Sequence, residues 1–166
     1  MIKSSKIMLL GDIAVGKTSL AKRLVFDRFD TDYKTTIGVN VLSHDLRLPD
    51  GETTRLVVWD TDGDFSHAIF RTTYILGASA AIIVADASRP ATMEKMAGLA
   101  DAFEERLPGR PMMLVLNKID LVAPGAAPPD VPSLSRRELV RASAMTGEGV
   151  AAMFENLAET IRRRGL

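Results

Sequence analysis

The chain of 166 residues has no cysteine, few aromatic residues and no long apolar run. The lack of cysteine excludes disulfides, cysteine-ligated zinc, thiol catalysis, and prenyl or palmitoyl attachment to these residues. Met1 is followed by isoleucine rather than the glycine that myristoylation requires, so we expect no direct lipid anchor. Apolar stretches such as residues 78–85 are far shorter than a bilayer span, and the start has no signal-peptide pattern. We therefore expect a cytoplasmic protein.

An excess of charge of either sign is also missing. Lysine plus arginine and aspartate plus glutamate number 21 each, so no overall field draws the chain to nucleic acid or to an anionic membrane. A chain of this length forms one domain by the usual scaling, and its hydrophobic content of 46% is ordinary for a globular protein. We expect a single domain over residues 1–166, with no nucleic-acid partner.

What the sequence does contain is a phosphate-binding loop. Residues 11–18, GDIAVGKT, fit the pattern G-x-x-x-x-G-K-[ST], with an apolar strand at 7–10 before them and helical spacing over 17–25 after them. The glycines let backbone N–H groups face a β-phosphate, Lys17 adds a positive charge, and the Thr18 hydroxyl ligates Mg²⁺. The phosphates then lie at a helix N-terminus. The pattern predicts binding of a nucleoside triphosphate with Mg²⁺.

Apolar segments alternate with helical segments along the chain. The expected strands cover residues 7–10, 39–48, 55–59, 81–85, 112–116 and, more weakly, 138–142. The expected helices cover residues 17–25, 67–76, 92–107 and 150–164. Residues 49–51, Pro-Asp-Gly, predict an antiparallel hairpin between the second and third strands. We expect an α/β fold with a six-stranded, mostly parallel sheet, helices on both faces, and one antiparallel hairpin at an edge.

Three further motifs follow expected strands, where ligands bind in sheets of this kind. Asp60 is a carboxylate that would reach Mg²⁺ through water, and the N–H of Gly63 would meet a γ-phosphate. Residues 117–120 read NKID, in which Asp120 would accept two N–H bonds from a guanine edge. A backbone N–H at residues 143–144 would meet the guanine oxygen. Together these motifs favour guanine over adenine.

With these motifs in this order, the chain resembles the Ras superfamily of small GTPases over residues 5–161, and it is most similar to the Rab branch. The matching residues are Gly11, Asp12, Val15, Gly16, Lys17, Thr18, Thr35, Thr36, Ile37, Gly38, Val39, Trp59, Asp60, Thr61, Asn117, Lys118, Ile119, Asp120, Ser143 and Ala144. The resemblance implies a G domain that binds GTP or GDP with Mg²⁺, hydrolyses GTP, and closes residues 30–38 and 63–73 on the γ-phosphate. Effectors and regulators would contact residues 30–38 and 63–74.

The resemblance also implies roles for individual residues. Phe29 would stack on the base, Tyr33 would cover the phosphates, and Thr36 would supply a second hydroxyl to Mg²⁺, while Trp59 and Tyr74 would either face effectors or lie in the core. The implied metal ligands are Thr18, Thr36 and Asp60. The implied catalytic residues are Lys17, Thr36, Gly63 and Asp64. The implied nucleotide contacts are Asp12, Ala14, Val15, Gly16, Lys17, Thr18, Ser19, Phe29, Tyr33, Thr36, Gly63, Asn117, Lys118, Asp120, Ser143, Ala144 and Met145.

Several positions depart from the family pattern. Asp64 stands where the family has a glutamine that orients the attacking water, and a carboxylate is shorter, only accepts hydrogen bonds, and adds negative charge. Ile13 crowds the space that a water or an arginine finger enters, and Met145 replaces a lysine that covers the base. We expect slow, partner-stimulated hydrolysis, with Asp64 as a general base and His67 as a water-orienting residue left as alternatives. Asp62 either adds further negative charge or is merely solvated.

A proline-rich segment, residues 122–133, interrupts the alternation. We expect a surface loop, and a polyproline ligand built on Pro129 and Pro132 is the alternative. Because this segment stands where the family has its fourth long helix, part of the sheet near the fifth and sixth strands should be uncovered. We expect a monomer, and a dimer through that uncovered edge is the alternative.

Two other functions stay open at this point. Asp64 and Ile13 would also suit a GTP-bound scaffold that hydrolyses too slowly to cycle. An adenine-specific ATPase would require that Asp120 does not contact the base.

Overall fold

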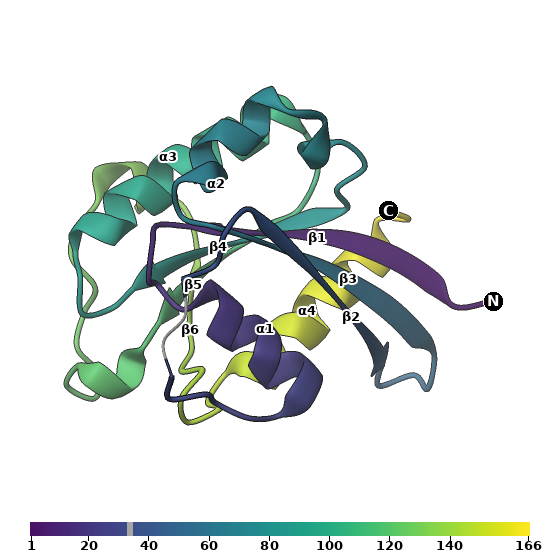
Figure 1. Cartoon of the computed structure of the whole chain (residues 1–166), viewed down its shortest axis with the longest axis horizontal. Helices are drawn as coiled ribbons and strands as arrows, with labels where there is room; N and C mark the ends of the chain where they lie inside the picture. Colours follow the sequence, from purple (N-terminus) through teal and green to yellow (C-terminus); the bar gives the residue numbers. More distant parts are fainter. Residues whose placement is uncertain (33–34) are drawn as a thin grey trace.

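The computed structural model describes residues 1–32 and 35–166, and a six-stranded sheet runs through them (Figure 1). The strand order is β2-β3-β1-β4-β5-β6, with β2 antiparallel to β3 and the other neighbours parallel. The strands are β1 (Lys3–Gly11), β2 (Val39–Arg47), β3 (Thr53–Thr61), β4 (Ala80–Asp86), β5 (Met112–Asn117) and β6 (Leu139–Arg141). The predicted α/β fold, with an antiparallel hairpin at one edge, is confirmed.

Helices cover both faces of this sheet, as the alternating side chains of β1 require. Ile7 and Leu9 lie in the core cluster that α1 and α4 cover, whereas Met8 and Leu10 lie in the cluster that α3 covers (Figure 1). Each of these four side chains is fully buried. The α-helices of the described residues are α1 (Lys17–Phe26), α2 (Phe65–Ala68), α3 (Ala91–Arg106) and α4 (Val150–Arg163). None of them is long and apolar enough to cross a membrane.

The prediction of one helix over residues 67–76 is wrong. The chain there forms the four-residue helix α2 and two 3₁₀ turns, Ile69–Arg71 and Thr73–Ile75. Thr72 breaks the helix with extended backbone angles, and its hydroxyl donates to the Ile69 carbonyl and accepts from the Tyr74 N–H. A threonine side chain that bonds nearby backbone competes with helical hydrogen bonds, which accounts for the interruption.

The expectation of an uncovered sheet near β5 and β6 is also wrong for the buried part of β5, whereas the residues of β6 are partly exposed. Leu134, at the end of the 3₁₀ turn Pro132–Leu134, is 5% exposed and packs in the same core cluster as Leu114 and Leu116 of β5. Arg137 then bonds two acidic side chains of α3, Asp101 at 2.9 Å and Glu104 at 2.8 Å. The end of the proline-rich segment and the residues directly after it, 132–137, therefore cover part of the sheet in place of a helix.

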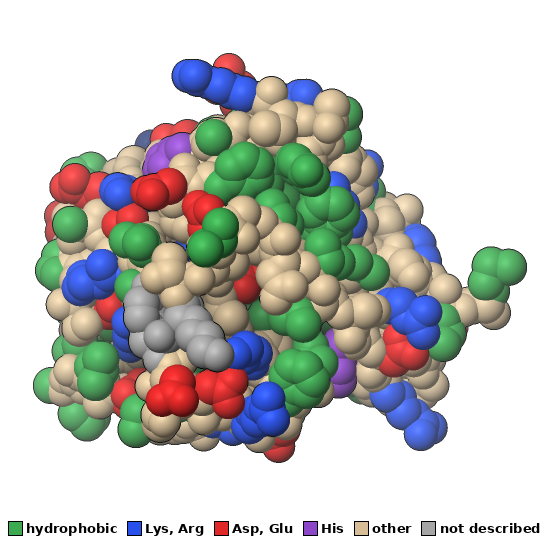
Figure 2. All heavy atoms as spheres, in the orientation of Figure 1, with side chains coloured by type: hydrophobic (Ala, Val, Ile, Leu, Met, Phe, Trp, Pro, Cys, Tyr) green, Lys and Arg blue, Asp and Glu red, His purple; other side chains and the backbone are tan. Residues whose placement is uncertain are grey.

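Apolar side chains gather on one face of the molecule, extending from the α2 region towards β2 and β3 (Figure 2). Tyr74 and Leu76 are each 47% exposed, whereas Trp59 packs partly against the core beneath α3. The Trp59 and Tyr74 rings lie 5.9 Å apart, and the Lys6 ammonium lies 3.9 Å from the centre of the Trp59 ring. The sequence left open whether Trp59 and Tyr74 face a partner or lie in the core. Tyr74 is exposed enough to face a partner, whereas Trp59 is partly buried against the core.

Candidate nucleotide-binding site

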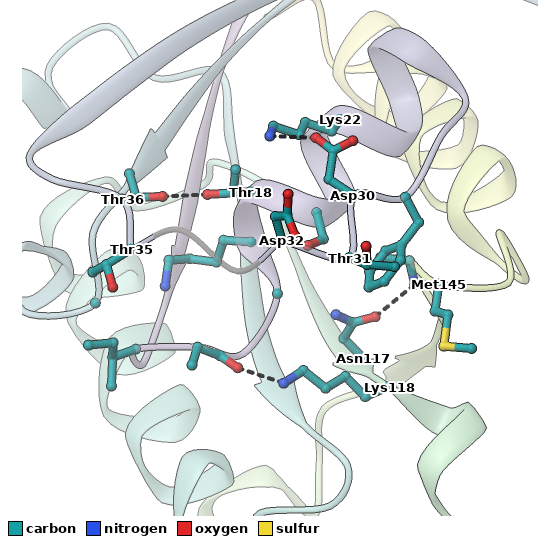
Figure 3. A pocket seen from close by; sticks show the side chains of 18 of the residues that line it. Thr18, Lys22, Asp30, Thr31, Asp32, Thr35, Thr36, Asn117, Lys118 and Met145 are labelled. Atoms are coloured by element: carbon teal, nitrogen blue, oxygen red, sulfur yellow. Dashed lines mark hydrogen bonds and ion pairs between the residues drawn. The ribbon is translucent and has the colours of Figure 1, made fainter.

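A cavity of about 300 Å³ lies at the carboxyl ends of the central strands, between the loop that follows β1 and the segments that follow β3, β5 and β6. The predicted nucleotide contacts that line it are Ala14, Gly16, Lys17, Thr18, Ser19, Phe29, Thr36, Gly63, Asn117, Lys118, Asp120, Ala144 and Met145. Several of these residues point into the same space from different elements (Figure 3). One cavity thus brings together segments that are more than a hundred residues apart in sequence.

The remaining predicted contacts have other surroundings. The Asp12 carboxylate turns to the side and accepts from Lys95 of α3 at 2.8 Å. The Val15 side chain is fully buried in the core, so only its backbone can face the cavity. Ser143 is fully buried and does not line the cavity. Asp64, predicted as catalytic, is exposed and does not line it either. Tyr33 lies outside the described residues, so its predicted role stays a prediction.

The loop between β1 and α1 has the backbone that its sequence predicts. Gly16 has φ 98°, and a Cβ there would lie 2.3 Å from the Asn117 amide nitrogen, so this position accepts only glycine. Ala14 also has a left-handed backbone, with φ 58°. Such left-handed turns point successive N–H groups to one side and form a concave anion site.

Lys17 is the buried cation of this loop. Its ammonium donates to the carbonyls of Gly11 at 3.0 Å and Asp12 at 2.7 Å, so the loop curls around it. Burial lowers the pKa of Lys17 to about 8, although the carboxylates of Asp60 and Asp12 oppose the shift. A bound anion in the cavity would favour the charged form of this lysine.

Three oxygen-bearing side chains converge beside Lys17. The Thr18 hydroxyl lies 2.5 Å from both the Thr36 hydroxyl and an Asp60 carboxylate oxygen, and Figure 3 shows the two threonines pointing towards one another. The other Asp60 oxygen, Oδ1, is buried and has no hydrogen-bond partner among the described residues. Burial raises the pKa of Asp60 to about 6, against the effects of the Thr18 hydrogen bond and the Lys17 charge.

This donor set suits Mg²⁺, which prefers oxygen ligands and keeps several waters. Asp60 offers a buried oxygen with an unused acceptor, and Thr18 and Thr36 offer hydroxyls. The described residues contain no cluster of three or more histidine or acidic side chains that would hold a metal without help. The residues therefore fit an ion that is shared with phosphate oxygens.

The other end of the cavity is built by the residues that follow β5 and β6. The Asn117 side chain accepts from the Ala144 N–H at 3.1 Å and donates to the Val15 carbonyl at 2.9 Å. The Ser143 hydroxyl donates to an Asp120 carboxylate oxygen at 2.6 Å. Asn117 thus links the end of β5 to the phosphate loop and to the loop after β6. Asp120 lines the cavity and is held in place by Ser143.

Asp86 is a residue that the sequence motifs did not reveal. It is 2% exposed, and its carboxylate lies 2.9 Å from the Lys118 ammonium and 3.1 Å from Arg89 Nε. Those two cations in turn donate to consecutive carbonyls of the phosphate loop, Lys118 to Ala14 at 2.7 Å and Arg89 to Ile13 at 2.6 Å. Only the folded chain brings Asp86 beside the loop, so no local pattern marks it.

The side of the cavity where a γ-phosphate would lie is tightly packed. A Cβ on Gly63 would lie 2.3 Å from the backbone nitrogen of Ile13, so any side chain here would displace the loop. The Ile13 side chain itself is 42% exposed, and Asp64 and His67 are both exposed. Ile13 also lines the cavity, and its crowding of an incoming water or arginine finger stays a prediction.

Two features define the class of this protein: an α/β sheet whose first strand leads into a phosphate-binding loop, and a second recognition motif at the far end of the same cavity. They are typical of a P-loop nucleotide-binding domain.

Comparison with known proteins identifies the family. The sequence model of the Ras family matches residues 6–163. The chain is 32% identical over 166 residues to Ras-related protein Rab-18 of Lymnaea stagnalis, covering 97% of this chain and 82% of that protein. It is 31% identical over 162 residues to Ras-related protein Rab-5B of Plasmodium falciparum (isolate 3D7), covering 96% of this chain and 78% of that protein. The chain therefore belongs to the Ras family, as a Rab-like small GTPase.

Proposed function

We propose that this protein binds GTP and GDP with Mg²⁺ and works as a conformational switch whose intrinsic GTP hydrolysis is slow. The observation that carries the proposal is the pairing of two kinds of group in one cavity. Lys17 lies at one end of it and Asp120 at the other, as a triphosphate and a guanine base require. Membership of the Ras family supports the same reading.

The residues divide the work of binding by their chemistry. Lys17 and the loop N–H groups face the phosphates, while Asp120 accepts the two N–H groups of a guanine edge, which adenine does not offer. Phe29 and Met145 flank the base. Thr18, Thr36 and Asp60 would hold Mg²⁺, which when bound neutralises charge on the phosphate oxygens.

Slow hydrolysis follows from two side chains at the γ-phosphate side. Asp64 is exposed and cannot donate a hydrogen bond, so it cannot orient water as a carboxamide does. Ile13 adds a branched side chain beside Gly63. We infer that a partner which contacts residues 30–38 and 63–74 supplies the missing groups, and that exposed Tyr74 and Leu76 form part of its docking surface.

A GTP-bound scaffold with negligible hydrolysis is the second candidate. The same two side chains favour it, because both obstruct hydrolysis while the phosphate loop, Lys17 and the predicted Mg²⁺ ligands stay intact. The two candidates differ only in the rate of the chemical step.

Nucleotide titration followed by single-turnover hydrolysis separates these readings. GTP and GDP should bind with Mg²⁺, and ATP should compete poorly. A rate near 10⁻⁴ per second, that of an unaided Ras-type site, would indicate a partner-dependent switch. A rate below detection with normal GTP affinity would indicate the scaffold, and preferential ATP binding would overturn the proposal.

Asp64→Gln tests the argument about water orientation. Glutamine restores a group that both donates and accepts, so we expect single-turnover hydrolysis to rise about tenfold while GDP affinity stays within about twofold. Asp130→Asn, on an exposed loop, removes one negative charge elsewhere and serves as the control. An unchanged or lower rate in Asp64→Gln would mean that Asp64 is itself an adapted catalytic group.

A further inference from the structure

The Asp62 carboxylate joins residues 30–38 and residues 63–73, the two segments that are expected to move with the nucleotide. One carboxylate oxygen accepts from the Gly38 N–H at 2.8 Å, and the other accepts from the Phe65 N–H at 2.6 Å. Gly38 directly precedes β2, and Phe65 is the first residue of α2. Asp62 is therefore not merely solvated, as one of the sequence interpretations held.

Backbone bonds strengthen the same junction. The Asp62 N–H donates to the Gly38 carbonyl at 2.9 Å, so Asp62 and Gly38 hold each other by two hydrogen bonds. The Asp62 carbonyl accepts from both the N–H and the hydroxyl of Ser66, at 3.0 Å and 3.1 Å. Asp62 thus bonds both Gly38, at the end of residues 30–38, and the first turn of α2.

The junction is tied to the phosphate loop as well. The Ser66 side chain is fully buried, and its hydroxyl lies 2.8 Å from the Thr61 hydroxyl and accepts from the Gly11 N–H at 3.3 Å. The Thr61 hydroxyl in turn donates to the Leu9 carbonyl at 2.8 Å. The Ser66 and Thr61 side chains therefore fix the start of α2 to β1 without any contribution from a nucleotide.

We propose that Asp62 is a positioning residue that holds residues 35–38 and the start of α2 together in both nucleotide states. This inference rests on the proposed function. In a switch held together by the γ-phosphate, both segments relax once that group leaves. Here the Asp62 carboxylate supplies charge-assisted hydrogen bonds to both segments, so the loss of the phosphate releases them less completely. The change between the GTP and GDP states is consequently confined to the parts of the two segments outside this junction.

Amide hydrogen exchange measured by NMR tests this role, because Gly38 and Phe65 report the two bonds directly. In the wild-type protein with GDP, both amides should be protected. Asp62→Ala should speed exchange at both by about tenfold or more, and a non-hydrolysable GTP analogue should restore part of the protection. Asp62→Asn should give a smaller effect, because its single amide oxygen can accept from one N–H but its NH₂ cannot replace the second acceptor.

The controls keep this test separate from that of the proposed function. Asp130→Ala removes an exposed carboxylate of the proline-rich segment and should leave both amides unchanged. Unprotected amides in the GDP-bound wild type, or unchanged protection in both Asp62 variants, would overturn the role of Asp62. If guanine nucleotides fail to bind, the proposed function fails, while exchange at Gly38 and Phe65 without nucleotide still reports whether the junction exists.

Discussion

Asp86 shows how one buried carboxylate can set the shape of a phosphate loop without touching it. Lys118 and Arg89 each bond Asp86 and a loop carbonyl, so the carboxylate orients both cations and each cation orients one peptide group. Burial works to raise the pKa of Asp86, but the hydrogen bonds from Ser88, Lys118 and Arg89 outweigh it and hold the pKa below its usual value. The folded state therefore favours the charged form of Asp86.

Asp86→Asn should lower the free energy of unfolding at pH 7 by about 2 kcal/mol, because charged hydrogen bonds are lost in a buried place. Since the folded pKa is depressed, the stabilisation is present above the unfolded pKa of about 3.9 and is lost as the pH falls through the folded value. The difference in the free energy of unfolding between the wild type and Asp86→Asn should thus become smaller below about pH 4. Urea unfolding from pH 7 to pH 3 measures it, with Asp130→Asn as the control. A gap that is independent of pH would contradict the assignment.

At the scale of elements, the proline-rich segment replaces a helix by other means. A helix covers a sheet with a continuous apolar stripe, but residues 122–133 contain four prolines that prevent one. Val131 of the segment instead packs against the core, and Leu134, directly after the segment, is buried there. Arg141 Nη1 donates to the Ala126 carbonyl at 2.9 Å.

Leu134→Ala should lower the free energy of unfolding by about 2 to 3 kcal/mol, because it removes a buried side chain beside β5 and leaves a cavity. Leu121→Ala, at a side chain that is 61% exposed, is the matched control and should change stability by less than about 0.5 kcal/mol. Chemical denaturation without nucleotide measures both variants. Equal effects would mean that Leu134 does not cover the sheet.

At the scale of the whole molecule, the candidate site belongs to no single element. Its lining comes from loops after four strands, from α1 and from the segment between α1 and β2. Asn117 bonds both the phosphate loop and the loop after β6. A ligand that fills this cavity would contact segments that fold together but lie far apart in sequence. Binding and global stability should therefore be linked.

We expect GDP with Mg²⁺ at about one hundred times its dissociation constant to add about 2.7 kcal/mol to the free energy of unfolding. For a domain of this size that corresponds to a rise of about 5 to 10 °C in the melting temperature. A thermal melt with equal concentrations of GDP and ADP measures the effect, and ADP should give little of it. Equal shifts for both nucleotides would contradict guanine recognition by Asp120.

Much of this molecule could be predicted from local patterns. The strand periodicity, the Pro-Asp-Gly turn and the phosphate loop depend on residues close together in sequence, and the structure has the predicted sheet and hairpin. The prediction of one helix over residues 67–76 was wrong, because the Thr72 side chain bonds the nearby backbone and competes with the helical hydrogen bonds that periodicity alone favours.

Local sequence also carries the identity of the chemical groups: a lysine and a threonine in a glycine loop, a carboxylate after β3, and an NKID motif after β5. The partners of those groups come from the tertiary structure. Asp62 meets Gly38 across 24 positions, and Arg89 meets Ile13 across 76. A short motif constrains only its own backbone, whereas contacts of this kind depend on how the strands order and pack, which is settled by burial of the whole core.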